Sequence, residues 1–379
     1  MSGSTLVPAS PEKLRGWKPS LQAGASIWAL SLFMASPPFA SWSWKNIAAG
    51  RSADFLALCR DPLTRNLRED ILAYRIATPV IAWLLHLPAA AALMLPFGFS
   101  LGALVVIHRA VSQRSTTLLA TIVTIGVGCS STFHFTHGVL GYQDALTHLC
   151  AAIALLGAIP LAATAIFVGC MNDERIALAL PFIALWRFSA VQARSWQPPF
   201  ARGELTQAVA PLAAGMVAAL LLRHALTVGW IGAGITTPSV YLQMVDDLRH
   251  LSPYLRSWSV WLANWLAGPG WLWLLVLAPG ASAQWRPAGW PAAFLVATFL
   301  GVCASTFVVA DAGRSIGFAF PAALVGCVWL HDRAPAIAAK LALVVASLQV
   351  ITPALWIYQD WQWILFRPFP WEFWLFLHR

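Results

Sequence analysis

The chain has 379 residues, of which 59% are hydrophobic and only 10% are charged, and its formal net charge is +9. A soluble domain carries about 25% charged residues because its surface faces water, so this composition excludes an ordinary soluble protein. Nucleic-acid binding is not indicated either, because the basic residues form no run and lie mostly between apolar stretches.

The N-terminal part predicts one membrane span followed by a charged loop. Residues 1–20 hold three basic side chains and precede an apolar stretch at Leu21–Ala40. We therefore expect a cytoplasmic N-terminal segment and an uncleaved first span. Residues 41–75 are the longest charge-rich stretch of the chain and are expected as an outer loop.

Further apolar stretches of about the 20 residues that a span requires predict an all-α, polytopic transmembrane bundle of about ten spans. Ile76–Leu87 and Ala89–Ile107 flank Pro88, and they form either one long tilted helix or a half-helix followed by a span. Ala145–Met171 is long for one span, and Pro160 near its middle offers a hairpin as the alternative. The remaining stretches are Thr117–Phe135, Arg175–Ala190, Gln207–Leu222, Ser259–Leu277, Pro291–Ala310, Ser315–Leu330 and Ala336–Tyr358.

Two segments are expected to lie along the membrane interface. The loop at 227–258 contains an amphipathic stretch, and the tail at 361–379 is aromatic and interrupted by prolines. Arg109 and Arg114 favour a cytoplasmic position for their loop, whereas the sidedness beyond the fourth span stays open.

The acidic residues give the clearest functional signal, because charge inside a membrane is costly and usually tied to a partner or a function. Asp54, Asp61 and Asp70 lie in the charged loop together with Arg68 and Arg75. One interpretation is a carboxylate acting as general base beside arginines that hold a phosphate. The alternative is a solvated loop whose charges pair with one another.

Polar groups also interrupt the apolar runs further along the chain. His134, His137, Asp144 and His148 could hold a divalent metal ion or form an interfacial histidine pair. Asp173 and Glu174 belong to the polar sequence Asn172–Arg175, which is also typical of a simple helix start. Arg314 follows Asp311 and either grips a lipid phosphate or pairs with that acid.

The stretch from Asp61 to Pro79 reads D-P-x-x-x-x-x-R-x-x-x-x-A-Y-R-x-x-x-P. A span followed by such an acid-bearing loop resembles the start of bacterial GT-C glycosyltransferases, and the resemblance covers Leu21–Ala190. It implies an enzyme that takes a sugar from a polyprenyl-phosphate donor on the outer face and passes it to a lipid, protein or glycan. It also implies a catalytic acid in the first outer loop, which here means Asp54, Asp61 or Asp70.

The leading hypothesis is therefore a multi-pass transferase of the bacterial inner membrane. Its expected partners are membrane lipids, a polyprenyl-phosphate-linked sugar and other membrane proteins, with no nucleic acid, and a divalent cation is the one cofactor considered. Catalysis is assigned to Asp54, Asp61 and Asp70, and substrate binding to Arg68, Arg75, His137, Asp144, Asp173, Glu174 and Arg314. The alternatives are a non-catalytic subunit of a larger complex and a transporter.

Overall fold

The computed structural model describes residues 17–36, 51–64, 67, 75–138, 141–191, 202–231, 258–281, 289–306, 312–357 and 363–378. Helices dominate these residues, and one short hairpin of strands β1 (Ala354–Ile357) and β2 (Trp363–Phe366) accompanies them. The helices are α2 (Trp17–Met34), α4 (Arg51–Arg60), α5 (Ala77–Leu84), α6 (Ala89–Ser112), α7 (Thr117–Gly128), α8 (Ser131–Gly138), α9 (Asp144–Leu156), α10 (Ile159–Asn172), η3 (Glu174–Ala179), α11 (Leu180–Val191), α12 (Arg202–Thr227), α15 (Trp258–Ala267), η4 (Gly270–Leu272), α16 (Trp273–Ala281), α17 (Gly289–Ser305), α18 (Ala312–Gly317), α19 (Phe320–Arg333), α20 (Pro335–Ile351) and α21 (Phe369–Leu377).

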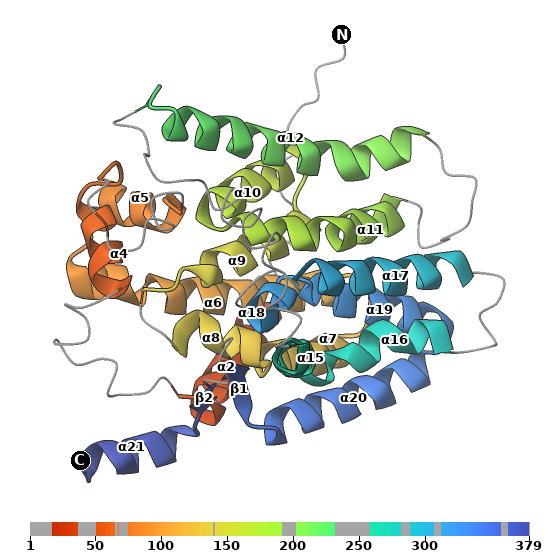
Figure 1. Ribbon diagram of the computed structural model, residues 1–379. Helices are drawn as coiled ribbons and strands as arrows, with labels where there is room; N and C mark the ends of the chain where they lie inside the picture. Colours follow the sequence, from red (N-terminus) through yellow and green to blue (C-terminus); the bar gives the residue numbers. More distant parts are fainter. Residues whose placement is uncertain are drawn as a thin grey trace.

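Most helices lie side by side with similar axis directions, as Figure 1 shows. α12 forms one edge of this bundle and α20 the opposite edge, while α4 and α5 lie together at one end. The closest neighbours are α10 with α9 and α12, and α6 with α2 and α9. The predicted all-α class is thus confirmed for the described residues, apart from the small hairpin.

The centre of the bundle is α19, in which every residue from Phe320 to Leu330 is buried. Small side chains let neighbouring backbones approach closely, as is common between helices in membranes. At Gly326, a Cβ atom would lie 3.0 Å from the carbonyl carbon of Leu275 in α16. Packing of backbone against backbone therefore fixes α16 on α19.

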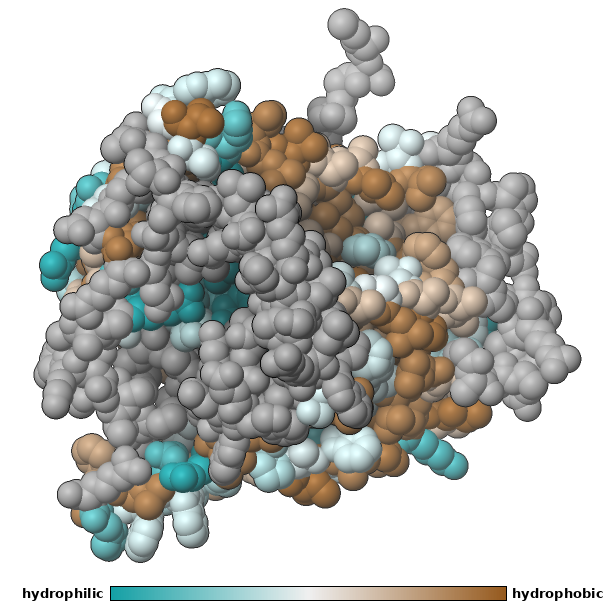
Figure 2. Space-filling view, viewed as in Figure 1, coloured by the Kyte–Doolittle hydropathy of each residue, from teal (hydrophilic) through white to brown (hydrophobic). Residues whose placement is uncertain are grey.

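Three helical stretches among the described residues are long and apolar enough to cross a membrane: Ala89–Ser112, Leu205–Thr227 and Ala312–Arg333. Figure 2 shows hydrophobic surface on the upper and right-hand parts of the described residues, and hydrophilic surface on the left, where α4 and α5 lie, and along the lower edge. The expected number of about ten spans stays a prediction, because the other apolar helices are shorter.

The two alternatives left open by the sequence are decided by helix breaks. Pro160 stands in the first turn of α10, so Ala145–Met171 is a hairpin of α9 and α10 and not one tilted span. Its helices have 13 and 14 residues, which is about 20 Å each and shorter than a bilayer core. Likewise α5 is a half-helix that ends before Pro88, and α6 follows as a separate helix.

The C-terminal part differs from the expectation of a span followed by a tail. α20 ends at Ile351 before Pro353, and the aromatic residues that follow form the β1–β2 hairpin, with Ala354 opposite Phe366. Aromatic and β-branched residues favour such paired strands. In the described part of the aromatic tail, β2 is followed by α21. The predicted amphipathic stretch of the 227–258 loop lies outside the described residues.

Candidate functional site

The closed α9–α10 hairpin brings three acidic residues to one place. Asp144 opens α9, Asp173 follows the last residue of α10, and Glu174 opens η3. Because the two helices pack against each other, the start of the first meets the end of the second. Two polar sequences that lie 28 residues apart in the chain (residues 144 to 172) thus become one cluster.

Asp144 is paired with two arginines and is only 2% exposed. Arg314 of α18 donates from Nε to Asp144 Oδ2 and from Nη2 to Asp144 Oδ1, the latter over 3.1 Å. Arg175 of η3 donates from Nη2 to Asp144 Oδ1 over 3.3 Å. The bidentate contact between Arg314 and Asp144 holds α18 against the start of α9, because a guanidinium group matches a carboxylate in shape.

Asp173 and Glu174 bind the remaining arginines. Arg75 approaches Asp173 Oδ2 at 3.3 Å and Glu174 Oε1 at 3.1 Å, through separate terminal nitrogens. Arg175 donates to both oxygens of Asp173, and Arg223 of α12 lies 2.9 Å from Glu174 Oε2. Three separate segments of the chain, around Arg75, around residues 173–175 and around Arg223, therefore meet at two neighbouring carboxylates.

The electrostatics of this charge network favour ionised carboxylates. Burial by itself raises the pKa of Glu174, but Arg75 and Arg223 outweigh burial and the neighbouring Asp173, and they hold the pKa at about 2. The pKa of Asp173 is likewise lowered, because Arg175 and Arg75 more than offset its burial. The network contains four arginines and three carboxylates, so it carries an excess positive charge.

A neutral hydrogen-bond network fixes the backbone beside these charges. Asn172 Oδ1 accepts from the backbone nitrogen and hydroxyl of Thr78 at 3.2 and 2.7 Å. Its Nδ2 donates to the carbonyl of Gln143 at 2.6 Å and to the Thr147 hydroxyl at 2.8 Å. One buried amide thus ties the start of α5 to both ends of the α9–α10 hairpin, and all its hydrogen-bonding capacity is used.

A small pocket opens between this network and α4. Its empty space of about 170 Å³ includes open solvent, and it is lined by Arg51, Arg75, Gly141, Tyr142, Gln143, Asp144 and Arg314. The guanidinium groups of Arg51 and Arg314 lie 4.1 and 4.4 Å from the centre of the Tyr142 ring. Cation–π contacts therefore orient two of the three arginines that line the pocket.

The turn that carries this pocket depends on a glycine. Gly141 has a φ of +84°, which side chains other than glycine rarely adopt, and a Cβ there would lie 2.8 Å from the backbone nitrogen of Ser52. The backbone of Gly141 therefore packs directly against the first turn of α4, so this turn contacts the segment that leads into α9. Arg51 reaches the pocket from this first turn.

Two groups on the pocket have polar atoms without partners among the described residues. Gln143 is 5% exposed, yet neither its Oε1 nor its Nε2 makes a hydrogen bond. The Nε of Arg75 is also buried and unpaired, although the terminal nitrogens of the same side chain are engaged. Buried polar atoms normally have a partner, so these atoms point to a ligand or to water in the pocket.

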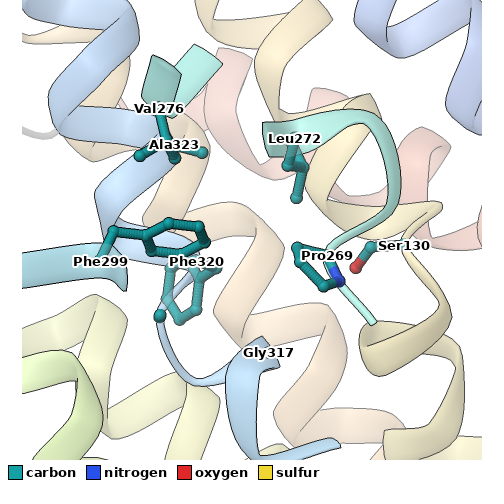
Figure 3. A pocket seen from close by; sticks show the side chains of 9 residues that line it. Ser130, Pro269, Leu272, Val276, Phe299, Gly317, Phe320 and Ala323 are labelled. Carbon is teal, nitrogen blue, oxygen red and sulfur yellow. The ribbon is translucent and has the colours of Figure 1, made fainter. Parts of the chain in front are cut away.

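Two further small pockets lie in the bundle. The first shares Arg314 with the arginine pocket and includes Thr132, whose hydroxyl contacts the Gly268 and Gly313 carbonyls at 2.9 and 3.2 Å. The second has a mainly apolar lining. Figure 3 shows the rings of Phe299 and Phe320 on one side of it and Leu272, Pro269 and Ser130 on the other.

Five of the residues predicted to bind substrate come together in this site: Arg75, Asp144, Asp173, Glu174 and Arg314. Arg314 pairs with Asp144, whereas Asp311, the acid with which the sequence suggested it could pair, lies outside the described residues. The expected helix start is also present, since Asp173 Oδ1 accepts from the Arg175 backbone nitrogen at 3.0 Å.

The predicted catalytic acids are less closely associated with the site. Asp54 is buried in α4, one turn after Arg51. Asp61 is exposed beyond the end of that helix, and its carboxylate accepts from the Leu63 backbone nitrogen at 3.0 Å. Asp70, Arg68 and the side chain of His137 lie outside the described residues.

Sequence reasoning did not assign a binding role to Arg51, Gln143, Arg175 or Arg223. Arg223 had a usable signal, because it is a charged residue within the apolar stretch Leu205–Thr227. Gln143 had none, since one glutamine in a loop is ordinary until its burial is known. No group of three or more His, Cys, Asp or Glu side chains in the described part of the chain is placed to hold a metal ion.

Comparison of the chain with protein-family models, with curated proteins and with solved structures finds no match.

Proposed function

We propose that this protein is a multi-pass enzyme of the bacterial inner membrane that binds a polyprenyl-phosphate-linked sugar and transfers the sugar at the outer leaflet. The observation that carries the proposal is the pocket lined by Arg51, Arg75 and Arg314 against a single carboxylate, Asp144. Three guanidinium groups converging on one small polar pocket favour an anion with several oxygens, and a phosphate is such a group.

The charges around the pocket support an anionic ligand in a second way. Arg75 and Arg314 are 6% and 4% exposed, and buried cations are costly unless they are paired. Their carboxylate partners hold them in place but leave the network one positive charge in excess. A bound phosphate supplies negative charge where the protein itself lacks it.

The position of the pocket within an apolar bundle supports a lipid-linked ligand. Apolar surface makes up most of the lining of the two further pockets in the bundle. The expected bundle of about ten spans would place the hydrocarbon part of a lipid-linked ligand in the bilayer.

The reaction in this proposal is a single displacement at the sugar. An acceptor hydroxyl attacks the anomeric carbon, a new C–O bond forms, and the C–O bond to the lipid phosphate breaks with its electron pair leaving on phosphate. Asp54 takes the hydroxyl proton as general base, and the arginines stabilise the charge that develops on the leaving phosphate. Asp54 is preferred to Asp61, because it is buried and shares a helix face with Arg51.

Binding tests the proposal first. The purified protein is expected to retain endogenous polyprenyl phosphate, detected by mass spectrometry of its lipid extract, and the variant Arg51→Gln should retain at least tenfold less. Arg60→Gln is the matched control, since Arg60 is an exposed arginine at the other end of the same helix. Equal retention in Arg51→Gln and Arg60→Gln would refute the assignment of the pocket.

Activity tests the chemical step separately. Membranes supplied with a polyprenyl-phosphate-linked radioactive sugar should transfer label to an acceptor fraction, and Asp54→Asn should reduce this transfer by about 100-fold or more. Asp61→Asn is expected to keep it. Unchanged transfer by Asp54→Asn, with lipid retention intact, would remove Asp54 as the base.

Transport is the second candidate, and one observation favours it. Three helix breaks lie together: the one between α7 and α8, the one after α15 and the one near α18. They meet where the Thr132 hydroxyl contacts the Gly268 and Gly313 carbonyls. Broken helices meeting beside a charged site are typical of transporters. Uptake of an anionic solute into proteoliposomes, without chemical change and sensitive to Arg51→Gln, would favour transport over transfer.

A further inference from the structure

Gln143 presents to the arginine pocket both a hydrogen-bond donor and an acceptor that no described residue satisfies. An amide has two N–H donors and one carbonyl acceptor, and here the side chain is 5% exposed. The unpaired Nε of Arg75 adds another donor on the same pocket. The unpaired hydrogen-bonding groups on the pocket are therefore two kinds of donor, the Arg75 Nε–H and the Gln143 Nε2–H, and one acceptor, Gln143 Oε1.

The acceptor is the informative atom. Phosphate oxygens satisfy the Arg75 Nε–H and the Gln143 Nε2–H, but an ionised phosphate has no hydrogen to give to Gln143 Oε1. A ligand with an anionic group alone would leave that oxygen buried and unpaired, which is unfavourable. A ligand that also carries a hydroxyl or N–H group beside its anion satisfies all three atoms.

We infer that the ligand of this pocket carries a hydrogen-bond donor next to its phosphate, and that Gln143 is the residue that selects for it. This inference rests on the proposed binding of a phosphate-bearing lipid and narrows its headgroup to a hydroxylated or amine-bearing one. A sugar attached to phosphate meets the requirement, and a simple alkyl phosphodiester does not.

The backbone around Gln143 is held so that the side chain stays on the pocket. The backbone carbonyl of Gln143 accepts from Asn172 Nδ2 at 2.6 Å, and the same Asn172 amide also binds Thr78 and Thr147. The preceding ring of Tyr142 is in contact with two guanidinium groups. A recognition group held by its surroundings loses little conformational entropy when the ligand binds, which sharpens discrimination.

The test compares two lipids that differ only in the donor. Binding of the purified full-length protein to phosphatidylglycerol, whose headgroup carries hydroxyls, is measured against phosphatidylmethanol, which has the same phosphodiester charge and no hydroxyl. Both are presented in detergent micelles. The wild-type protein is expected to bind phosphatidylglycerol about tenfold more tightly, because each lost bond to a buried polar group weakens binding by roughly this factor.

The variant Gln143→Leu is expected to bind the two lipids equally, with its affinity for phosphatidylmethanol at or above that of the wild type. Gln113→Leu, at an exposed glutamine outside the pocket, should keep the tenfold preference. Thermal unfolding of each variant verifies that it is folded, and Gln143→Asn serves as a second variant that keeps an amide on a shorter side chain and should show a reduced preference.

The outcomes separate this inference from the function on which it rests. Equal binding of the two lipids by the wild type, or a preference that persists in Gln143→Leu, overturns the role of Gln143 and leaves phosphate binding standing. Binding of neither lipid by the wild type, or binding that Arg51→Gln does not weaken, overturns the phosphate pocket and the inference with it.

Discussion

Arg75 illustrates how single residues divide their hydrogen bonds at this site. Its two terminal nitrogens hold Asp173 and Glu174, while its Nε remains unpaired on the pocket. Lysine could not do both, because its single ammonium lacks the planar fork of arginine. In Gln143 the backbone and the side chain have separate roles. The backbone carbonyl binds Asn172, and the side-chain amide, which has no partner among the described residues, lies on the pocket.

The unpaired amide of Gln143 gives a stability prediction at the residue scale. Gln143→Leu is expected to raise the free energy of unfolding of the ligand-free protein by about 1–3 kcal/mol, because a buried, unsatisfied polar group is removed. Gln349→Leu is the matched control, since the Gln349 amide accepts from the Trp271 backbone nitrogen at 2.8 Å and donates to the Cys129 carbonyl. That variant should be destabilised. Denaturant unfolding in detergent measures both, and the same sign for the two variants would contradict the prediction.

The lowered pKa of Glu174 gives a second prediction. Its pKa is about 2 in the folded protein against an ordinary value of 4.5, so its contribution to stability is full above about pH 4.5 and is lost as the pH falls toward 2. Asp173 contributes in the same direction. Glu174→Gln should unfold more easily than the wild type at pH 6, and the difference should shrink by pH 3. Thermal unfolding at the two pH values measures this, and a constant difference would count against it.

At the scale of elements, helix breaks decide where the polar groups meet. Pro160 turns one apolar stretch into the α9–α10 hairpin, so that Asp144 and Asp173 become neighbours. Pro269 separates α15 from η4 and α16, and the chain at this break packs directly against Gly313 before Arg314. If these helices were continuous, the same residues would lie at different depths in the bundle and would not contact one another.

This packing gives a prediction on two glycines. A Cβ at Gly268 would lie 2.9 Å from the Gly313 Cα and closer still to its carbonyl oxygen, whereas a Cβ at Gly301 would have no heavy atom within 4 Å. Gly268→Ala should therefore cost about 1–3 kcal/mol through overpacking. Gly301→Ala, inside α17, should be neutral or stabilising by about 0.5–1 kcal/mol. The difference in unfolding free energy between the variants tests the close approach, and equal stabilities would refute it.

At the scale of the whole molecule, α4 and α5 lie together at one end of the bundle, as Figure 1 shows. α4 packs on the first turns of α6, through Phe55 and Leu93 among others. α6 then runs for 24 residues, or about 36 Å, to the exposed Gln113. Asp61 and Gln113 are thus expected to mark opposite sides of the membrane.

Cysteine labelling tests this arrangement. Asp61→Cys should react with a membrane-impermeant maleimide added to intact cells, and Gln113→Cys only after the membrane is opened. The background should be low, because five of the six native cysteines are buried and burial raises the pKa of the Cys59 thiol to about 12, which suppresses the reactive thiolate. Labelling of both variants from the same side would contradict the predicted topology.

Composition and periodicity predicted an all-α membrane protein, and the described residues confirm the helices. An excess of apolar residues and scarce charges predict helices for a lipid environment, because only helices and closed barrels satisfy their backbone inside a membrane. The same reasoning identified Arg75, Asp144, Asp173, Glu174 and Arg314, since a charge in an apolar run needs a partner.

Only the tertiary structure decided which partner each of these charges has. Arg314 binds Asp144, which lies 170 residues before it in the chain. Arg51 and Gln143 acquire their place on the pocket from the glycine turn at Gly141 and the buried amide of Asn172. Pairing depends on distances across the fold, and those distances follow from how broken helices pack, which no local pattern of residues encodes.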